Sequence, residues 1–113
     1  MWTAMESVQF EAGRTDLQSK CVDKIAKLAA WVSENPDVVI GLDGHRDDPA
    51  AHGNDPALSA RRVVAVRDAL IAGGVAPARI VVGEFGTRQF VCRDNTENCM
   101  ALSRRVDVHA ARR

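Results

Sequence analysis

Two amphipathic helical segments alternate with short apolar strands, and this alternation limits the possible folds more than any other feature of the chain. Apolar residues recur at steps of three or four from Leu17 to Val32, which predicts a helix with one buried face. The nearly continuous apolar run at residues 38–42 is typical of a strand in the middle of a sheet. A chain with this pattern must bury the helix face and the strand against each other.

The ends of the first helix carry recognisable signals. Thr15 and Gln18 have the spacing of a capping box, which predicts that the helix starts there. Pro36 predicts that it stops near residue 34, because proline disfavours helical geometry in the residue before it. The charged face of this helix is expected to be solvated surface.

A second helix is predicted between Asp55-Pro56 and Gly73-Gly74. Asp55 is a suitable N-cap, and proline is favoured at the first helical position. The glycine pair is suited to the turn that closes a helix, because glycine adopts left-handed geometry without strain.

Four short strands complete the predicted order β-α-β-α-β-β. They are expected at residues 7–10, 38–42, 80–82 and 105–109. The fold class is therefore an α+β two-layer sandwich, with two helices packed on one mixed parallel/antiparallel sheet. Strands joined through a helix are expected to pair in parallel, with right-handed crossovers, and the final strand to pair antiparallel as an addition. One domain is expected over residues 7–110, with flanking tails at 1–6 and 111–113.

Composition excludes several classes of protein. The 113 residues include 15 Lys and Arg against 15 Asp and Glu, so the formal net charge is zero. A general binder of nucleic acid or anionic membranes needs a cationic surplus. No apolar run approaches the roughly 18 residues of a membrane span, so membrane contact is expected only through a segment absent from this chain.

Residues 1–6 lack a basic start and an apolar run and do not predict a signal peptide. A cytosolic protein and a domain of a longer exported chain both remain open.

The cysteines leave alternatives open. Cys92 and Cys99 bracket a polar stretch that could close as a disulfide loop or carry two free thiols. Cys21 lies in an apolar helical stripe and is predicted to be a buried thiol. No metal site or cofactor is predicted, because there is no CxxC motif and the three histidines are scattered.

One charge interrupts the apolar face of the second helix. Arg62 lies four residues from both Leu58 and Val66, in the middle of that face. A buried charge is costly unless it is paired, and a cation near a helix N-terminus opposes the helix dipole. An anion is therefore expected opposite Arg62. It could be Asp47 or Asp48 in an internal ion pair, or the carboxylate of a ligand. The neighbouring Arg61 is expected to be ordinary surface.

Several motifs, in order, resemble the OmpA-like C-terminal domain family. They are residues 44–47 (GHRD), 58–62 (LSARR) and 103–108 (SRRVDV), and the family's patterns are G-H-T-D, N-x-x-L-S-x-x-R and N-R-R-V-E-I. Residues 8–13 and 74–80 resemble its first strand and turn and its link into the third strand. The resemblance covers about residues 7–110. Asp47 precedes Arg62 by 15 residues, which is the offset between the family's two ligand-binding residues.

The resemblance implies a binding domain that tethers an outer-membrane or envelope protein to peptidoglycan. By resemblance, Asp47 would accept hydrogen bonds from the ammonium of diaminopimelate in the stem peptide, and Arg62 would grip the adjacent carboxylate. Asp55 and Arg104 would lie at the same ligand site. The implied location is the periplasm, as the soluble domain of an envelope protein. Some relatives carry a disulfide loop before the last strand, which would pair Cys92 with Cys99.

Four positions depart from the family pattern and motivate a second function. They are Arg46 for Thr, Ala50 for Gly, Asp55 for Asn and Ser103 for Asn. A divergent member could instead act as a protein–protein interaction module in an envelope or secretion complex, with Asp47 and Arg62 as a structural ion pair. An enzyme is not predicted, because His45 and its neighbouring aspartates lack a nucleophile or metal-ligand spacing.

Overall fold

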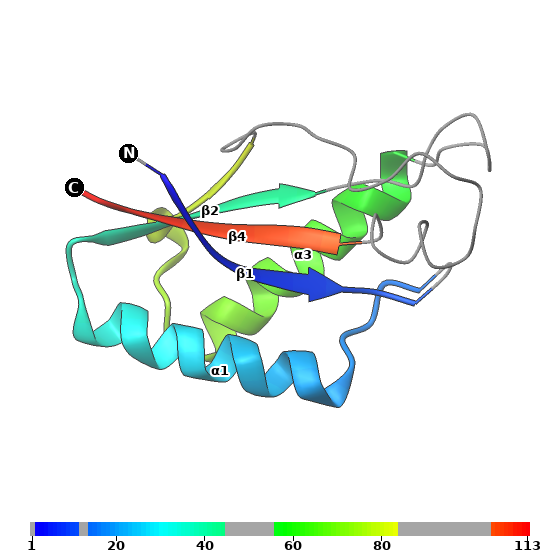
Figure 1. Cartoon of the computed structure of the whole chain (residues 1–113), viewed down its shortest axis with the longest axis horizontal. Helices are drawn as coiled ribbons and strands as arrows, with labels where there is room; N and C mark the ends of the chain where they lie inside the picture. The colour runs from blue at the N-terminus through cyan, green and yellow to red at the C-terminus, as the bar shows by residue number, and fades with distance from the viewer. Residues whose placement is uncertain (1, 12–13, 45–55, 84–104) are drawn as a thin grey trace.

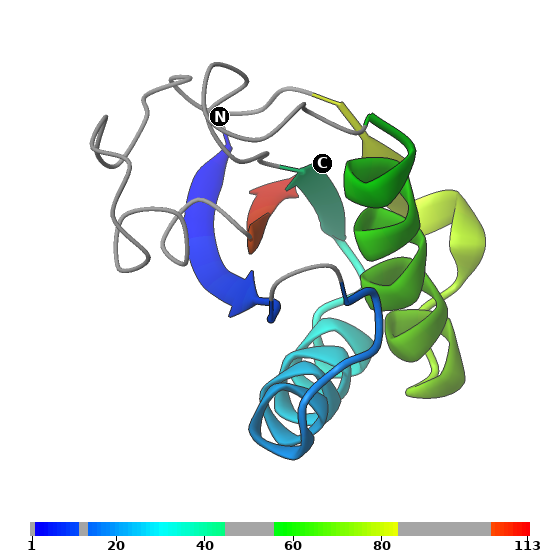
Figure 2. The ribbon, with the colours of Figure 1, turned by 90° about the vertical axis from the view of Figure 1, so that its right-hand side faces the viewer.

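In the part of the chain that the structure describes, two helices cover one face of a four-stranded sheet (Figure 2). The computed structural model describes residues 2–11, 14–44, 56–83 and 105–113, with side chains of the second helix described from residue 60 onward. Helices α1 (Ser19–Glu34) and α3 (Pro56–Ala72) lie on the same side of the sheet (Figures 1 and 2). The predicted two-layer α+β sandwich is confirmed. Neither of these helices combines the length and the apolar character needed to cross a membrane.

The sheet has the order β1-β4-β2-β3, and its final strand is central. The strands are β1 (Thr3–Gln9), β2 (Val38–Gly44), β3 (Ile80–Val82) and β4 (Arg105–Arg112). Strands β2 and β3 pair in parallel as predicted, whereas β4 is antiparallel to both β1 and β2. The expected direct pairing of the first two strands is therefore wrong, because β4 is inserted between them in a split β-α-β arrangement.

The position of β4 follows from its burial. Val106, Val108 and Ala110 face the helices, and His109 on the opposite face is also only 7% exposed. A strand at the edge of a sheet leaves one row of its backbone N–H and C=O groups unpaired. In β4 both rows are paired, one with β1 and the other with β2. The sheet also takes in residues that were expected to lie in the flanking tails, because β1 begins at Thr3 and β4 ends at Arg112.

Helix α1 begins later than the capping box predicted. Its first helical residue is Ser19, and Gln18 is the N-cap without a side-chain capping bond. The backbone oxygen of Gln18 accepts the first helical hydrogen bonds, from Cys21 and Val22. Residues 14–17 therefore lie outside the helix, where the Arg14 oxygen accepts a hydrogen bond from Arg62 and Leu17 packs against the core, contacts that the local pattern does not encode. The predicted end of the helix near residue 34 is confirmed.

The core lies between the sheet and the helices. Cys21 is 1% exposed, and its Sγ lies 3.8 Å from the Gln9 oxygen, which confirms a buried thiol. Most of the remaining buried side chains are aliphatic and come from both layers. The most deeply buried are Val8, Ile25, Ala29, Val32, Val38, Ile40, Leu42, Val66, Leu70, Val75, Val106 and Val108.

Arg79 fastens the end of α1 to the start of β2. It closes the short 3-10 turn η1 (Pro77–Arg79). Its Nε donates to the Val38 oxygen at 3.0 Å, and its Nη2 donates to the oxygens of Val32 at 2.9 Å and Asn35 at 2.6 Å. One guanidinium thus satisfies carbonyl groups at a helix C-terminus, where a cation is also favoured by the helix dipole.

The helices lie close together where α3 ends. Gly73 follows the last residue of α3, and a Cβ added there would lie 2.7 Å from the Cβ of Ala29 on α1. We expect Gly73→Ala to lower the free energy of unfolding by about 1–2 kcal/mol, because neither Cβ can rotate away. Urea denaturation would measure the loss. Ala29→Gly is itself destabilising inside a helix, but the double variant should lose less than the sum of the two single losses. A purely additive double variant would contradict the contact as the cause.

Candidate functional site

Arg62 is buried in the helix layer, as its place in the apolar face predicted. Its exposed fraction is 2%, and it is the largest fully buried side chain among the described residues. It shares the inward face of α3 with Val66 and Leu70, which are both completely buried. The neighbouring Arg61 is exposed, which confirms its prediction as surface. Burial of a guanidinium requires strong compensating contacts.

Three of those contacts come from the segment that follows β1. The Arg62 Nε donates to the backbone oxygen of Arg14 at 2.9 Å, and Nη2 donates to that of Glu11 at 3.2 Å. The guanidinium carbon also lies 5.4 Å from the centre of the Phe10 ring. These groups are neutral, and the anion that the sequence predicts opposite Arg62 stays a prediction. Carbonyl dipoles and an aromatic face both stabilise a cation, so part of the compensation comes from groups without net charge.

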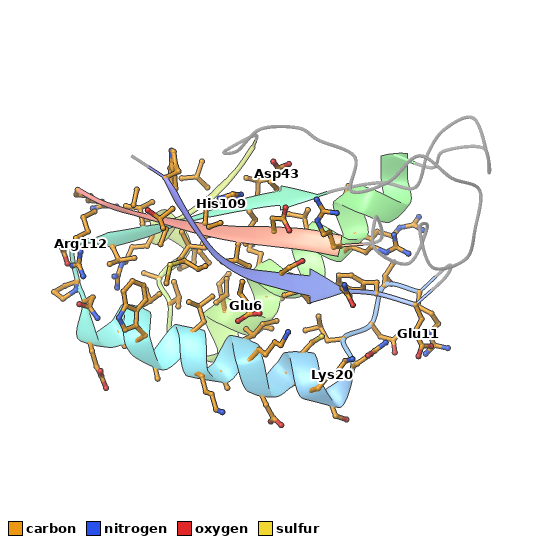
Figure 3. All side chains as sticks on the ribbon, in the orientation of Figure 1. Glu6, Glu11, Lys20, Asp43, His109 and Arg112 are labelled. Carbon is orange, nitrogen blue, oxygen red and sulfur yellow. The ribbon has the colours of Figure 1, made fainter. Side chains whose placement is uncertain are left out.

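The segment that holds Arg62 is itself shaped by local contacts. Phe10 is 3% exposed and anchors the segment in the core. The backbone N–H of Arg14 donates to the Glu11 oxygen at 3.0 Å, which closes a turn between the two acceptors of Arg62. Figure 3 places Glu11 beyond the C-terminal end of β1, away from the end of the molecule that carries Arg112. The acceptors therefore belong to one compact turn.

An exposed ion pair lies directly after this turn. The Arg14 Nε and Nη2 donate to the two carboxylate oxygens of Asp16 at 2.7 and 2.9 Å. The hydrogen bond from Arg14 and its positive charge hold the pKa of Asp16 below its usual range. The contribution of such a lowered pKa to stability is complete above the ordinary aspartate pKa and is lost only as the pH falls through the lowered value. The pair is consequently intact at neutral pH, although its exposure limits what it contributes.

The other predicted site residues lie outside the described residues. They are Asp47, Asp55 and Arg104, together with the cysteines Cys92 and Cys99. Their roles, and the disulfide, stay predictions. The same holds for His45 and for the substitutions in the family motifs.

Described residues next to these positions converge on one end of the sandwich. Gly44, at the end of β2, is opposite Val106 near the start of β4. Gln9, at the end of β1, is opposite Arg105, the first residue of β4. Helix α3 begins at Pro56 and brings Arg62 to the turn that follows β1. The chain segments that contain the predicted ligand residues therefore enter or leave the described structure near Arg62.

Sequence reasoning identified Arg62 but missed the turn that holds it. Backbone oxygens accept hydrogen bonds whatever the side chain, so no residue type marks Glu11 and Arg14 as partners. Of the three residues that contact Arg62, only Phe10 could be predicted to lie in the core. It follows Val8 by two residues, and alternate residues of a strand point to the same face. Within the described ranges, no group of three or more His, Cys, Asp or Glu side chains is arranged to hold a metal ion.

Comparisons with known proteins agree on one family. The sequence model of the OmpA family matches residues 9–104. The peptidoglycan-associated lipoprotein of Agrobacterium fabrum is 27% identical over 101 residues, covering 89% of this chain and 57% of that protein. Outer membrane porin F of Pseudomonas fluorescens is 28% identical over 101 residues, covering 89% of this chain and 31% of that protein. The chain thus spans less than two thirds of these relatives.

Solved structures share the fold over nearly the whole chain. The peptidoglycan-associated lipoprotein from Burkholderia pseudomallei superposes with a TM-score of 0.81 at 26% identity, covering 95% of this chain and 91% of that chain. The C-terminal domain of Helicobacter pylori MotB superposes with a TM-score of 0.78 at 21% identity, covering 96% of this chain and 86% of that chain. The second likeness, at its lower identity, concerns the fold alone.

Proposed function

Because this chain belongs to the OmpA family, we propose that it binds peptidoglycan without covalent attachment and anchors an outer-membrane or envelope protein to the cell wall. The observation that carries the proposal is the burial of Arg62 at the end of the sandwich where Gly44 and Val106, two described residues of the family motifs, are paired. The relatives named above as peptidoglycan-associated lipoproteins support it. An arginine at this position is suited to recognise a carboxylate, because its planar guanidinium can donate two parallel hydrogen bonds.

The proposed ligand is the diaminopimelate of the stem peptide, which is a zwitterion at its free end. Arg62 would bind its carboxylate and Asp47 its ammonium, with Asp55 and Arg104 at the rim of the site. Two or three charge-assisted hydrogen bonds contribute about 1.5–3 kcal/mol each. After the entropic cost of binding, a peptide fragment is expected to bind with a Kd in the micromolar to millimolar range. Such a clamp needs no net charge on the protein as a whole.

The proposed activity has no chemical step and uses no cofactor. It places the domain in the periplasm, on the cell-wall side of a longer envelope protein. A disulfide between Cys92 and Cys99 would suit that oxidising compartment. Partners other than peptidoglycan would be further proteins of the envelope.

Sedimentation with purified peptidoglycan tests the proposal directly. We expect Asp47→Ala and Arg62→Ala each to reduce the bound fraction at least tenfold, because each removes one half of the clamp for a zwitterion. The matched control is Arg61→Ala, which removes the same charge from the exposed neighbouring position on α3. Circular dichroism at the binding temperature would establish that each variant is folded.

A second function is favoured by the contacts that Arg62 makes within the protein. Its bonds to Glu11 and Arg14 give it a structural role that needs no ligand. The domain could then serve as a protein-interaction module of an envelope or secretion complex. A native protein that does not sediment with peptidoglycan, together with a lower Tm of Arg62→Ala, would support this alternative. Binding that is unchanged in both clamp variants would exclude only the clamp.

A further inference from the structure

The donor protons of Arg62 are not equivalent once the turn after β1 is in place. Nε carries a single proton, whereas Nη1 and Nη2 carry two each. The single Nε proton is used by the oxygen of Arg14 at 2.9 Å. One Nη2 proton is used by the oxygen of Glu11 at 3.2 Å. A carboxylate can therefore no longer be held by the pair Nε and Nη2, which is one of the two bidentate geometries open to a guanidinium.

We propose that the turn formed by Phe10, Glu11 and Arg14 is a positioning element of the ligand site, which holds Arg62 by its Nε side and directs its Nη1–Nη2 edge toward carboxylates. This inference rests on the proposed function and adds the geometry by which the ligand is gripped. It applies to any carboxylate that Arg62 meets, whether that of Asp47 or that of diaminopimelate. In this proposal the turn contacts the guanidinium of Arg62 and does not contact the ligand.

The turn is suited to hold a guanidinium in one orientation. Phe10 is fixed in the core, and its ring faces the guanidinium carbon at 5.4 Å. The two acceptors are linked by the hydrogen bond from the Arg14 N–H to the Glu11 oxygen, so they move together. Bidentate recognition depends on such alignment, because a rotated guanidinium offers only one proton to a planar carboxylate.

Lysine is expected to fail at this position although it keeps the charge. Its ammonium is a single point with three donors and no planar edge. If it satisfied the two carbonyl oxygens, it could not also grip a carboxylate through two parallel bonds. We expect Arg62→Lys to weaken binding of a synthetic stem tripeptide containing free diaminopimelate by at least tenfold. Affinity equal to that of the native protein would overturn the positioning role.

Nuclear magnetic resonance of the native protein tests the orientation before any ligand is added. The bond to Arg14 predicts a scalar coupling between the Arg62 Nε and the Arg14 carbonyl carbon, and slow exchange of the Nε proton with water. Rapid exchange without that coupling would overturn the inference. Phe10→Leu should accelerate the exchange, whereas Val32→Ala, a truncation in the core at the C-terminal end of α1, should leave it unchanged.

Titration with the same tripeptide then separates the inference from the proposed function. We expect the Nη protons of Arg62 to shift on binding while the Nε coupling persists. Saturable binding with loss of the Nε coupling would overturn the inference and leave the proposed function standing. If the native protein neither shifts with the tripeptide nor sediments with peptidoglycan, the proposed function fails and this inference fails with it.

Discussion

Replacing Arg62 by methionine is expected to lower the free energy of unfolding by about 2–3 kcal/mol, or the Tm by roughly 10 °C. Methionine fills a similar volume but donates no hydrogen bond, so the oxygens of Glu11 and Arg14 lose their partner. The attraction between the guanidinium and the Phe10 ring is lost as well. Glu11 and Arg14 are exposed, so solvation of their oxygens is expected to limit the cost. Urea denaturation followed by circular dichroism would measure the change.

A control variant and a contradicting outcome determine how the loss of stability in Arg62→Met is interpreted. Arg61→Met removes an arginine from the exposed face of α3 and should change the free energy of unfolding by less than about 0.5 kcal/mol. An Arg62→Met variant as stable as the native protein would show that the turn contributes nothing through Arg62. That result would remove the basis of the positioning role, although a direct role in ligand binding would survive it.

An equally large loss is expected from Arg79→Met, which should lower the free energy of unfolding by about 2–3 kcal/mol. Arg79 donates three hydrogen bonds to backbone oxygens, of Val32, Asn35 and Val38. Two of these oxygens keep a second donor, since the N–H groups of Asn35 and Val38 bond to Val32 and Asn35 respectively. The loss is therefore smaller than three independent bonds would give. The urea midpoint and its slope would be measured together.

The conservative variant distinguishes hydrogen bonding from charge. Arg79→Lys keeps a cation near the helix C-terminus but cannot reach three oxygens with the geometry of a planar group. The free energy of unfolding of Arg79→Lys should therefore lie between those of Arg79→Met and the native protein. Full stability in the lysine variant would show that charge alone accounts for the contribution of Arg79. Neither variant should change the binding of peptidoglycan, because Arg79 lies at the opposite end of β2 from Gly44.

The local sequence pattern was sufficient to predict the helices and strands but not the order of the strands in the sheet. The order of helices and strands, the end of α1 near residue 34 and the parallel pairing of β2 with β3 follow from periodicity, proline and short connections. The insertion of β4 between β1 and β2 does not, because strand order is decided by pairing between residues far apart in sequence. The start of α1 was missed for a similar reason, since residues 14–17 are held outside the helix beside the turn that contacts Arg62.

The sequence by itself determined that Arg62 lies on a buried helix face and that its charge needs compensation, because helical periodicity places it between apolar neighbours. It also determined the family, through motifs whose order and spacing are properties of the chain. Only the tertiary structure decided that backbone oxygens of Glu11 and Arg14 and the ring of Phe10 supply part of that compensation. Carbonyl groups are common to all residues, so their use as acceptors depends on where the backbone passes and not on which side chains it carries.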